Sequence, residues 1–219
     1  MEADPLQASE TTAKELFVLG GGGHAKVVID SLRSAAIVVA GIIDPRLQPG
    51  ERLMGVPVAG GDDFLSTRDP VRTQLANGVG ATVKSRVNRK LFEAWTARGF
   101  TFVTVVHASA TIAGDVRLDG GAQIMAGAVV QPYAHIGAGT VINTGCRVDH
   151  DCVVGEHCFI APSVTLCGGV TIGGGTFVGA GAVLLPGVRV GQNALVAAGA
   201  IVDIDVGDGE YFQRSRAGG

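Results

Sequence analysis

The sequence predicts a mixed fold, in which a small Rossmann-like α/β domain is followed by a parallel β-helix. Two observations predict it: an unbroken six-residue repeat in the second half, and alternating strand-like and helix-like segments in the first. The composition agrees, because 34 of the 219 residues are Gly and 47% are hydrophobic, whereas only 17% are charged. A chain of this kind buries a real core and is not disordered as a whole.

The repeat begins at Val106 and places Ile, Leu or Val at every sixth residue up to Val202. The fifth position of each hexad is small or β-branched, and no insertion breaks the phase. Two inward positions in six residues predict short β-segments, three to a coil, with successive coils paired as parallel strands ~4.8 Å apart. Cys146, Cys152 and Cys158 occupy the inward small position, so we interpret them as core residues rather than metal ligands or disulfides.

The first half predicts a small parallel sheet with helices between its strands. We expect strands at 15–19, 37–43, around Val56, at 73–76 and at 101–105, and helices at 25–33 and 82–98. The predicted organisation is a flexible leader at 1–13, an α/β domain at 14–105, a β-helix at 106–207 and a C-terminal tail at 208–219.

A glycine-rich turn, Gly20 to His24, separates the first strand from the first helix. Backbone N–H groups in such a turn approach a phosphate closely, and the helix N-terminus favours its negative charge. We therefore expect Gly22, Gly23 and His24 to bind a nucleotide diphosphate, Asp44 to accept a hydrogen bond from ribose or base, and Gly80 to cap a third strand at the same edge. The alternatives are a dinucleotide site, which needs a larger domain than residues 14–105 provide, and a tight turn that binds no ligand.

The second chemical signal is the segment Asp149-His150-Asp151. His150 occupies an outward position of its hexad, and a neighbouring carboxylate suits an imidazole to general-base work. One coil further on lies Gly168, which leaves space beside the imidazole and a backbone N–H able to polarise a carbonyl. The alternative is a surface histidine without a role.

A zinc site is the competing interpretation for the remaining histidines. The spacing of the four histidines of the repeat places no obvious pair of metal ligands on one face of the prism; they are His107, His135, His150 and His157. We expect no metal, and we expect His135 and His157 to be solvated turn residues.

The charge and hydropathy patterns exclude other classes of function. The formal net charge is -3 and no long run of Lys or Arg occurs, so no nucleic-acid partner is expected. Every long apolar stretch is interrupted by Gly, which predicts no membrane span. Residues 1–13 lack the pattern of a signal peptide, and the cysteine spacing is not a disulfide framework, so we expect a cytoplasmic protein.

Two motifs together resemble one family. V-L-G-G-G-G-H-A-K-V-V-I-D at 18–30 and I-N-T-G-C-R-V-D-H-D-C-V-V-G-E-H at 142–157 are similar to the sialic acid O-acetyltransferase type of hexapeptide-repeat acyltransferases. This type includes N-acetyltransferases of nucleotide-linked 4-amino-4,6-dideoxy sugars. The resemblance covers about residues 15–206 and implies a left-handed β-helix, acetyl-CoA as co-substrate, and a homotrimer with active sites between subunits.

The resemblance also implies roles for particular residues. His150 is the expected base with Asp151 as its carboxylate partner, Gly168 lies at the thioester, and Ala180 and Ala198 lie along the coenzyme groove. The nucleotide-sugar residues are those given above, with GDP-perosamine, an O-antigen precursor, as the expected acceptor. Sugar O-acetylation and non-catalytic nucleotide-sugar binding remain alternatives. Two departures are Phe159, where some relatives carry a second His, and a tail without the usual G-x-P-A.

Overall fold

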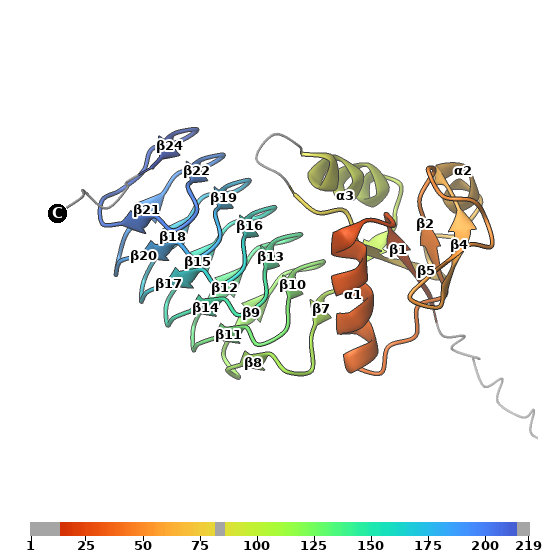
Figure 1. Ribbon diagram of the computed structural model, residues 1–219, viewed down its shortest axis with the longest axis horizontal. Helices are drawn as coiled ribbons and strands as arrows, with labels where there is room; N and C mark the ends of the chain where they lie inside the picture. The colour runs from red at the N-terminus through yellow and green to blue at the C-terminus, as the bar shows by residue number, and fades with distance from the viewer. Residues whose placement is uncertain (1–13, 82–85, 214–219) are drawn as a thin grey trace, which may run out of the picture.

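The computed structural model describes residues 14–81 and 86–213, so the expected leader at 1–13 lies outside the described residues. The N-terminal domain is a six-stranded sheet in the order β3-β4-β2-β1-β5-β6, parallel except for β3. Figure 1 shows it at one end of an elongated molecule. Its strands are β1 (Glu15–Leu19), β2 (Gly41–Ile43), β3 (Arg52–Leu53), β4 (Val56–Gly60), β5 (Thr73–Asn77) and β6 (Thr101–Phe102), and its helices are α1 (Gly23–Ser34), α2 (Asp62–Ser66) and α3 (Val87–Ala97).

Strand alternation divides this domain into two apolar layers. Leu16 and Val18 of β1 point to one face, where they pack with α1, whereas Phe17 and Leu19 point to the other, where they pack with α2 and α3. The predicted order of strands and helices is therefore confirmed. Helix α2 was missed because it has only five residues, and β2 is shorter than the expected strand at 37–43. The expected start of the last helix, at 82–85, lies outside the described residues.

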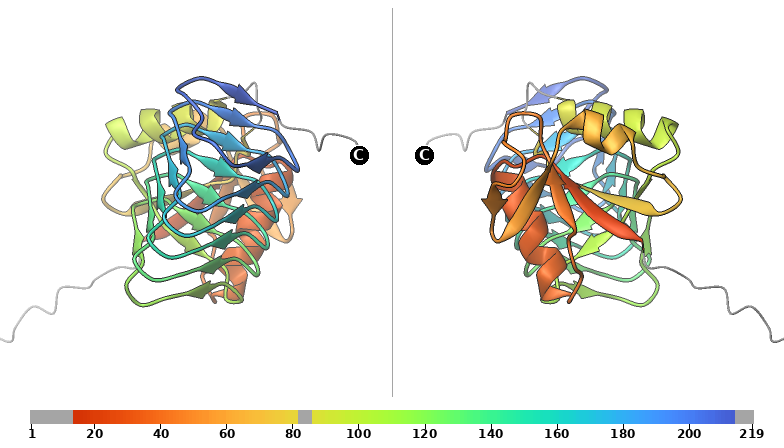
Figure 2. Two further views of the ribbon diagram at one scale, coloured as in Figure 1. Left: turned by 90° about the vertical axis from the view of Figure 1, so that its left-hand side faces the viewer. Right: turned by 90° about the vertical axis from the view of Figure 1, so that its right-hand side faces the viewer.

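The rest of the chain winds into a parallel β-helix with three flat faces, and Figure 2 (left) shows the triangular coils from the C-terminal end. Face 1 contains β7 (Val105–Val106), β10 (Gln123–Ile124), β13 (Val141–Ile142), β16 (Phe159–Ile160), β19 (Phe177–Val178), β22 (Leu195–Val196) and β24 (Tyr211–Phe212). Face 2 contains β8 (Thr111–Ile112), β11 (Val129–Val130), β14 (Arg147–Val148), β17 (Thr165–Leu166), β20 (Val183–Leu184) and β23 (Ile201–Val202). Face 3 contains β9 (Arg117–Leu118), β12 (His135–Ile136), β15 (Val153–Val154), β18 (Thr171–Ile172) and β21 (Arg189–Val190).

The register confirms the eighteen-residue coil. Val148 pairs with Leu166, eighteen residues on, and the same step relates the other paired strands of the β-helix up to β23. The winding is left-handed, as the resemblance implied. Strand β24 pairs with β22 and carries face 1 to residue 212, beyond the expected end of the β-helix at residue 207.

Inward side chains form one continuous apolar core. Cys146, Cys152 and Cys158 are buried free thiols within it, as predicted, and burial raises the pKa of each thiol to about 11. The two inward threonines are also satisfied, because Thr140 Oγ1 donates to the Gly155 carbonyl at 2.6 Å and Thr176 Oγ1 to the Gly191 carbonyl at 2.7 Å. The prism is therefore a rigid scaffold for residues at its corners.

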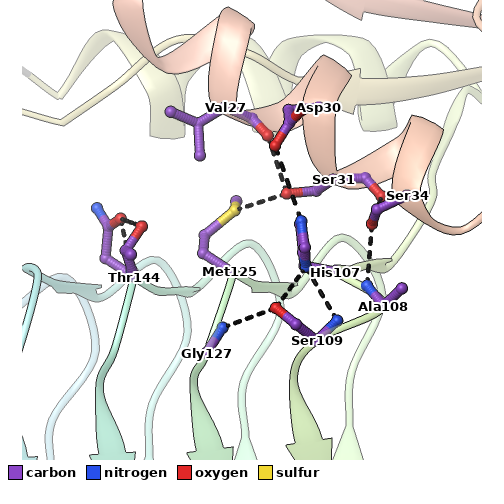
Figure 3. Close-up of polar contacts among 11 residues, drawn as sticks. Val27, Asp30, Ser31, Ser34, His107, Ala108, Ser109, Met125, Gly127 and Thr144 are labelled. Carbon is purple, nitrogen blue, oxygen red and sulfur yellow. Dashed lines mark hydrogen bonds and ion pairs between the residues drawn. The ribbon is translucent and has the colours of Figure 1, made fainter.

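Helix α1 joins the two domains by packing on the first coils of the β-helix (Figure 3). Met125 and Val141 are buried in the same cluster as the α1 side chains. Ser31 Oγ lies 3.4 Å from Met125 Sδ, and the Ala108 N–H donates to Ser34 Oγ at 2.9 Å. No helix among the described residues is long and apolar enough to span a bilayer.

Candidate active site

His150 lies in the turn that joins β14 of face 2 to β15 of face 3. The turn requires a left-handed residue, and Asp151 supplies it with φ +58°, a conformation that Asp tolerates better than most residues. The side chain of His150 is 61% exposed and lies outside the prism, as the hexad position predicted. The strands on either side of the turn are held in place by their buried residues, Val148 and Val154, so the position of the turn is fixed.

Two aspartates flank His150, and one of them, Asp151, contacts its imidazole. His150 Nδ1 lies 2.7 Å from Asp151 Oδ2, and the His150 backbone N–H donates to Asp149 Oδ1 at 2.8 Å. The hydrogen bond with Asp151 and the charge of Asp149 raise the pKa of His150 above its ordinary value. With Nδ1 bonded to a carboxylate, Nε2 is the nitrogen left to accept a proton.

Gly168 lies beside the ring, one coil above. A Cβ on Gly168 would lie 2.7 Å from both Nε2 and Cε1 of His150, so any larger residue would displace the imidazole. No hydrogen bond from the Gly168 N–H to another residue of 14–81 or 86–213 is present. The structure thus brings His150, Asp151 and Gly168 together, with an accepting nitrogen and a free donor at one corner.

The other histidines of the β-helix have structural partners. His135 is half-buried on β12, with Nε2 2.7 Å from Asp119 Oδ2. His157 is half-buried against Phe92 of α3, and burial lowers its pKa. The expectation of solvated turn residues was wrong for His135, which lies on a strand and contacts Asp119. His157 does lie in a turn, but Phe92 partly covers it. No three His, Cys, Asp or Glu side chains in the described part of the chain are placed to hold a metal ion.

Ala180 and Ala198 lie at a different corner, in the turns from face 1 to face 2. They line an apolar groove whose floor includes Phe177 and Leu195 of face 1 and whose end is Tyr211. Phe177 stacks on Phe159, with ring centroids 5.4 Å apart and planes 9° from parallel. The groove follows several coils along the prism, which suits an extended, partly apolar ligand.

The glycine-rich turn lies at the carboxyl edge of the N-terminal sheet. Strand β1 lies between β2 and β5, so the residues that follow these three strands meet there, at the point where strand order reverses. Gly20 has φ +87°, and Gly22 and Gly23 are exposed, with open space where a Cβ would be. Gly80 lies against His24, whose Cβ is 3.2 Å from an added Gly80 Cβ. The expected nucleotide residues are therefore neighbours.

Asp44 and His24 both use their polar atoms within the protein. Asp44 Oδ2 accepts from the Gly21 N–H at 2.8 Å, and both Asp44 oxygens accept from Arg46. The Arg46 side chain, with lesser help from backbone donors, lowers the pKa of Asp44 to about 2 against partial burial. His24 Nε2 lies 2.8 Å from Gln123 Oε1 of β10, and burial lowers the pKa of His24.

Sequence reasoning missed Gln123 and Arg46. Gln123 is buried and connects the domains, because its Nε2 donates to the Asn77 carbonyl at 2.7 Å while its Oε1 contacts His24. An outward glutamine on a hexad gives no signal of such a contact. Arg46 follows Asp44-Pro45 closely enough that a bidentate pair with Asp44 was a reasonable expectation from spacing.

Two family models match the chain. The PglD N-terminal domain matches residues 15–91, and the bacterial transferase hexapeptide model matches residues 133–168 and 169–203. No curated protein matches in sequence.

Solved structures match over nearly the whole chain. Perosamine N-acetyltransferase from Caulobacter crescentus, in complex with CoA and GDP-perosamine, is 38% identical with a TM-score of 0.83, over 90% of this chain and 92% of that one. The acetyltransferase domain of PglB from Neisseria gonorrhoeae, in complex with acetyl coenzyme A, is 30% identical with a TM-score of 0.83, over 91% and 95%. WeeI from Acinetobacter baumannii, 22% identical with a TM-score of 0.80 over 91% and 96%, shares the fold. The chain belongs to the hexapeptide-repeat acetyltransferases that carry a PglD-type N-terminal domain.

Proposed function

We propose that this enzyme transfers the acetyl group of acetyl-CoA to the amine of a nucleotide-linked 4-amino-4,6-dideoxy sugar, with GDP-perosamine as the best candidate acceptor. The observation that carries the proposal is the corner at His150, where a carboxylate-oriented imidazole faces a glycine with a free N–H. Similarity to structures that contain CoA and GDP-perosamine supports the choice of both substrates. Buried free cysteines agree with a reducing cytoplasm as its location.

The chemistry needs one base and one oxyanion donor. The sugar amine attacks the acetyl carbon and forms the C–N bond, while His150 Nε2 accepts the proton that the amine loses. The Gly168 N–H stabilises the negative charge on the acetyl oxygen. The C–S bond then breaks, and the thiolate leaves and takes up a proton. No covalent enzyme intermediate is required, because an amine is itself a good nucleophile and the buried cysteines hold their protons.

The coenzyme groove and the base lie at opposite edges of face 2. Ala180 and Ala198 belong to the corner between faces 1 and 2, whereas His150 belongs to the corner between faces 2 and 3. A homotrimer of parallel prisms would bring the His150 corner of one copy to the groove of the next, which is the arrangement we propose. Apolar side chains near the C-terminal end of the prism, Ile201, Ile204 and Tyr211, are exposed in the single chain and available for such packing.

The direct test is a thiol-release assay with acetyl-CoA and a set of nucleotide-linked amino sugars, followed by mass analysis of the product. We expect a 4-amino-4,6-dideoxy sugar to gain one acetyl group, and the product to resist hydroxylamine, which cleaves an ester but not an amide. His150→Asn is the inactive variant and His135→Asn the matched control. A hydroxylamine-sensitive product would establish O-acetylation instead. No transfer to any amine or hydroxyl would reject the proposal.

Mixing two inactive variants tests the shared site. Ala198→Trp blocks the groove at an exposed position, and His150→Asn removes the base. If each site takes its groove and its base from different copies, mixed trimers regain part of the activity that both parents lack. Absence of recovery in trimers that are shown to be mixed would place both parts in one chain.

A further inference from the structure

The N-terminal domain contains a cavity of about 290 Å³ next to the glycine-rich turn. It lies on the α2/α3 side of the sheet and opens at the carboxyl ends of β1 and β2, where Gly20 and Asp44 contribute to its wall. Ile43, Leu91 and Trp95 provide apolar surface. Its size is near the lower end of the ~300–1,000 Å³ typical of small-molecule sites. A flat aromatic base fits a cavity of this size, lining and position.

Two aspartates line the cavity, and their states differ. Asp44 already accepts the Gly21 N–H and three groups of Arg46, so it holds the turn in place and has little capacity left for a ligand. Asp62, the first residue of α2, is exposed, and its carboxylate makes no hydrogen bond or ion pair with residues 14–81 or 86–213. It is positioned next to Asp44 because the Asp44 N–H donates to the Gly60 carbonyl at 2.9 Å.

An ionised carboxylate accepts hydrogen bonds and donates none. Guanine presents two adjacent donors on its Watson–Crick edge, N1–H and the 2-amino group, which match the two carboxylate oxygens. Uracil presents one donor between two carbonyl oxygens, and adenine one donor beside an acceptor, so both place an acceptor against the carboxylate. A site built around such a pair rejects a base that cannot complete it.

We propose that this cavity binds the base of the nucleotide sugar, that the base is guanine, and that Asp62 is the residue that selects it. The inference rests on the proposed function, since it assumes a nucleotide whose diphosphate lies at Gly22 and Gly23. Asp44 then acts as a positioning residue that fixes the turn between base and diphosphate.

Trp95 is the only tryptophan in the chain and lines the cavity, so its fluorescence reports occupancy directly. The experiment titrates the full-length protein with GDP, inosine diphosphate, UDP and ADP. Because a bidentate contact is typically worth ~1–3 kcal/mol, we expect GDP to bind about 10- to 100-fold more tightly than UDP or ADP. Inosine diphosphate, which lacks the 2-amino group, should fall between them.

The Asp62→Asn variant should gain affinity for a different nucleotide, and misfolding could not cause such a gain. The asparagine amide donates where the carboxylate accepted, and so it matches xanthine, which carries a carbonyl in place of the 2-amino group. We expect this variant to lose GDP affinity by about 10- to 100-fold and to gain affinity for xanthosine diphosphate. Asp63→Asn, at an exposed neighbour outside the cavity lining, should bind as the wild type does.

The inference is overturned if Asp62→Asn binds GDP as the wild type does, if it gains nothing for xanthosine diphosphate, or if no nucleotide changes the Trp95 signal. Its failure is distinguishable from failure of the proposed function, because binding requires no acetyl transfer. Guanine selection by Asp62 without acetyl transfer would leave the inference standing and reject the enzyme activity. Acetyl transfer by the wild type, together with an Asp62→Asn variant whose nucleotide affinities match those of the wild type, would support the enzyme activity and reject the inference.

Discussion

Two histidine–carboxylate pairs lie on the same prism with the same separation and different surroundings. His135 and Asp119 are 2.7 Å apart on face 3, and His150 and Asp151 are 2.7 Å apart at the next corner. In the first pair, Arg117 binds the other oxygen of Asp119 at 3.1 Å, and the imidazole is half-buried. In the second, no Lys or Arg of residues 14–81 or 86–213 forms an ion pair with the carboxylates, and the ring is mostly exposed.

If His150 is the base, as we propose, a close histidine–carboxylate contact is not enough to make one, because His135 has such a contact too. His135 uses Nε2 for the contact and sits on a strand surrounded by side chains. His150 uses Nδ1, which leaves Nε2 beside Gly168, where the backbone leaves space and a donor. A reactive imidazole therefore needs a free nitrogen that faces an open position.

The largest expected difference between the pairs is in catalysis. His150→Asn should lower kcat by about 10²–10⁴-fold, the usual contribution of general-base catalysis, with little change in either KM. His135→Asn should lower it less than about threefold, since a group away from the reacting atoms contributes little to the transition state. Steady-state kinetics of both variants at one pH checks this. Equal losses of kcat in the two variants would show that the two histidines do not differ in their contribution to catalysis.

Gly168→Ala tests the open position beside His150. The new methyl group would lie 2.7 Å from Nε2 and must displace the ring, so kcat should fall by about 10- to 100-fold, as small misplacements of catalytic groups do. Gly114→Ala is the matched control, because Gly114 occupies the same position three coils earlier and an added Cβ meets no atom within 4 Å. An active Gly168→Ala enzyme with normal kinetics would show that the free space is not needed.

Asp151→Asn should shift the pH dependence of kcat. The base works when its imidazole is neutral, so the rate rises with pH through the pKa of His150, which Asp151 holds above the ordinary value of about 6.5. Removing that carboxylate lowers the pKa, and the rise should move to lower pH, although Asp149 retains part of the effect. The pH–rate profiles of Asp151→Asn and Asp119→Asn measure this. A shift of the pH–rate profile with Asp119→Asn but not with Asp151→Asn would assign the base to His135 instead.

The smallest effect concerns stability at the first pair. Partial burial opposes ionisation of Asp119, but hydrogen bonds from His135 and Arg117 lower its pKa overall. Stability from a depressed carboxyl pKa is present above the unfolded value and is lost as pH falls through the folded value. We therefore expect Asp119→Asn to cost less than about 1 kcal/mol near neutral pH, and less still in acid. Thermal unfolding at two pH values checks it, and a larger cost in acid would contradict it.

The β-helix could be predicted almost to the residue, because an aliphatic residue recurs at every sixth position from Val106 to Val202. The juxtaposition of His150 and Gly168 followed from the eighteen-residue coil by addition. The contact of Asp44 with Arg46, two residues on, could have been expected from spacing but was missed. The contact of His24 with Gln123 could not be predicted, because it depends on how polar side chains of two domains meet. Because neither internal partner was recognised, sequence alone assigned both Asp44 and His24 to the ligand.

We propose that His150 accepts a proton from the sugar amine, and this role is tested by kcat of wild type and His150→Asn with both substrates saturating. The measurement should run from about pH 5.5 to about pH 9, which brackets the ordinary histidine pKa of about 6.5. We expect the wild-type rate to rise through a pKa above that value, and the variant to stay about 10²-fold or more below the wild type even at the alkaline end. A variant that regains nearly the full kcat at high pH, while its sugar KM stays raised, would show that His150 only positions the substrate.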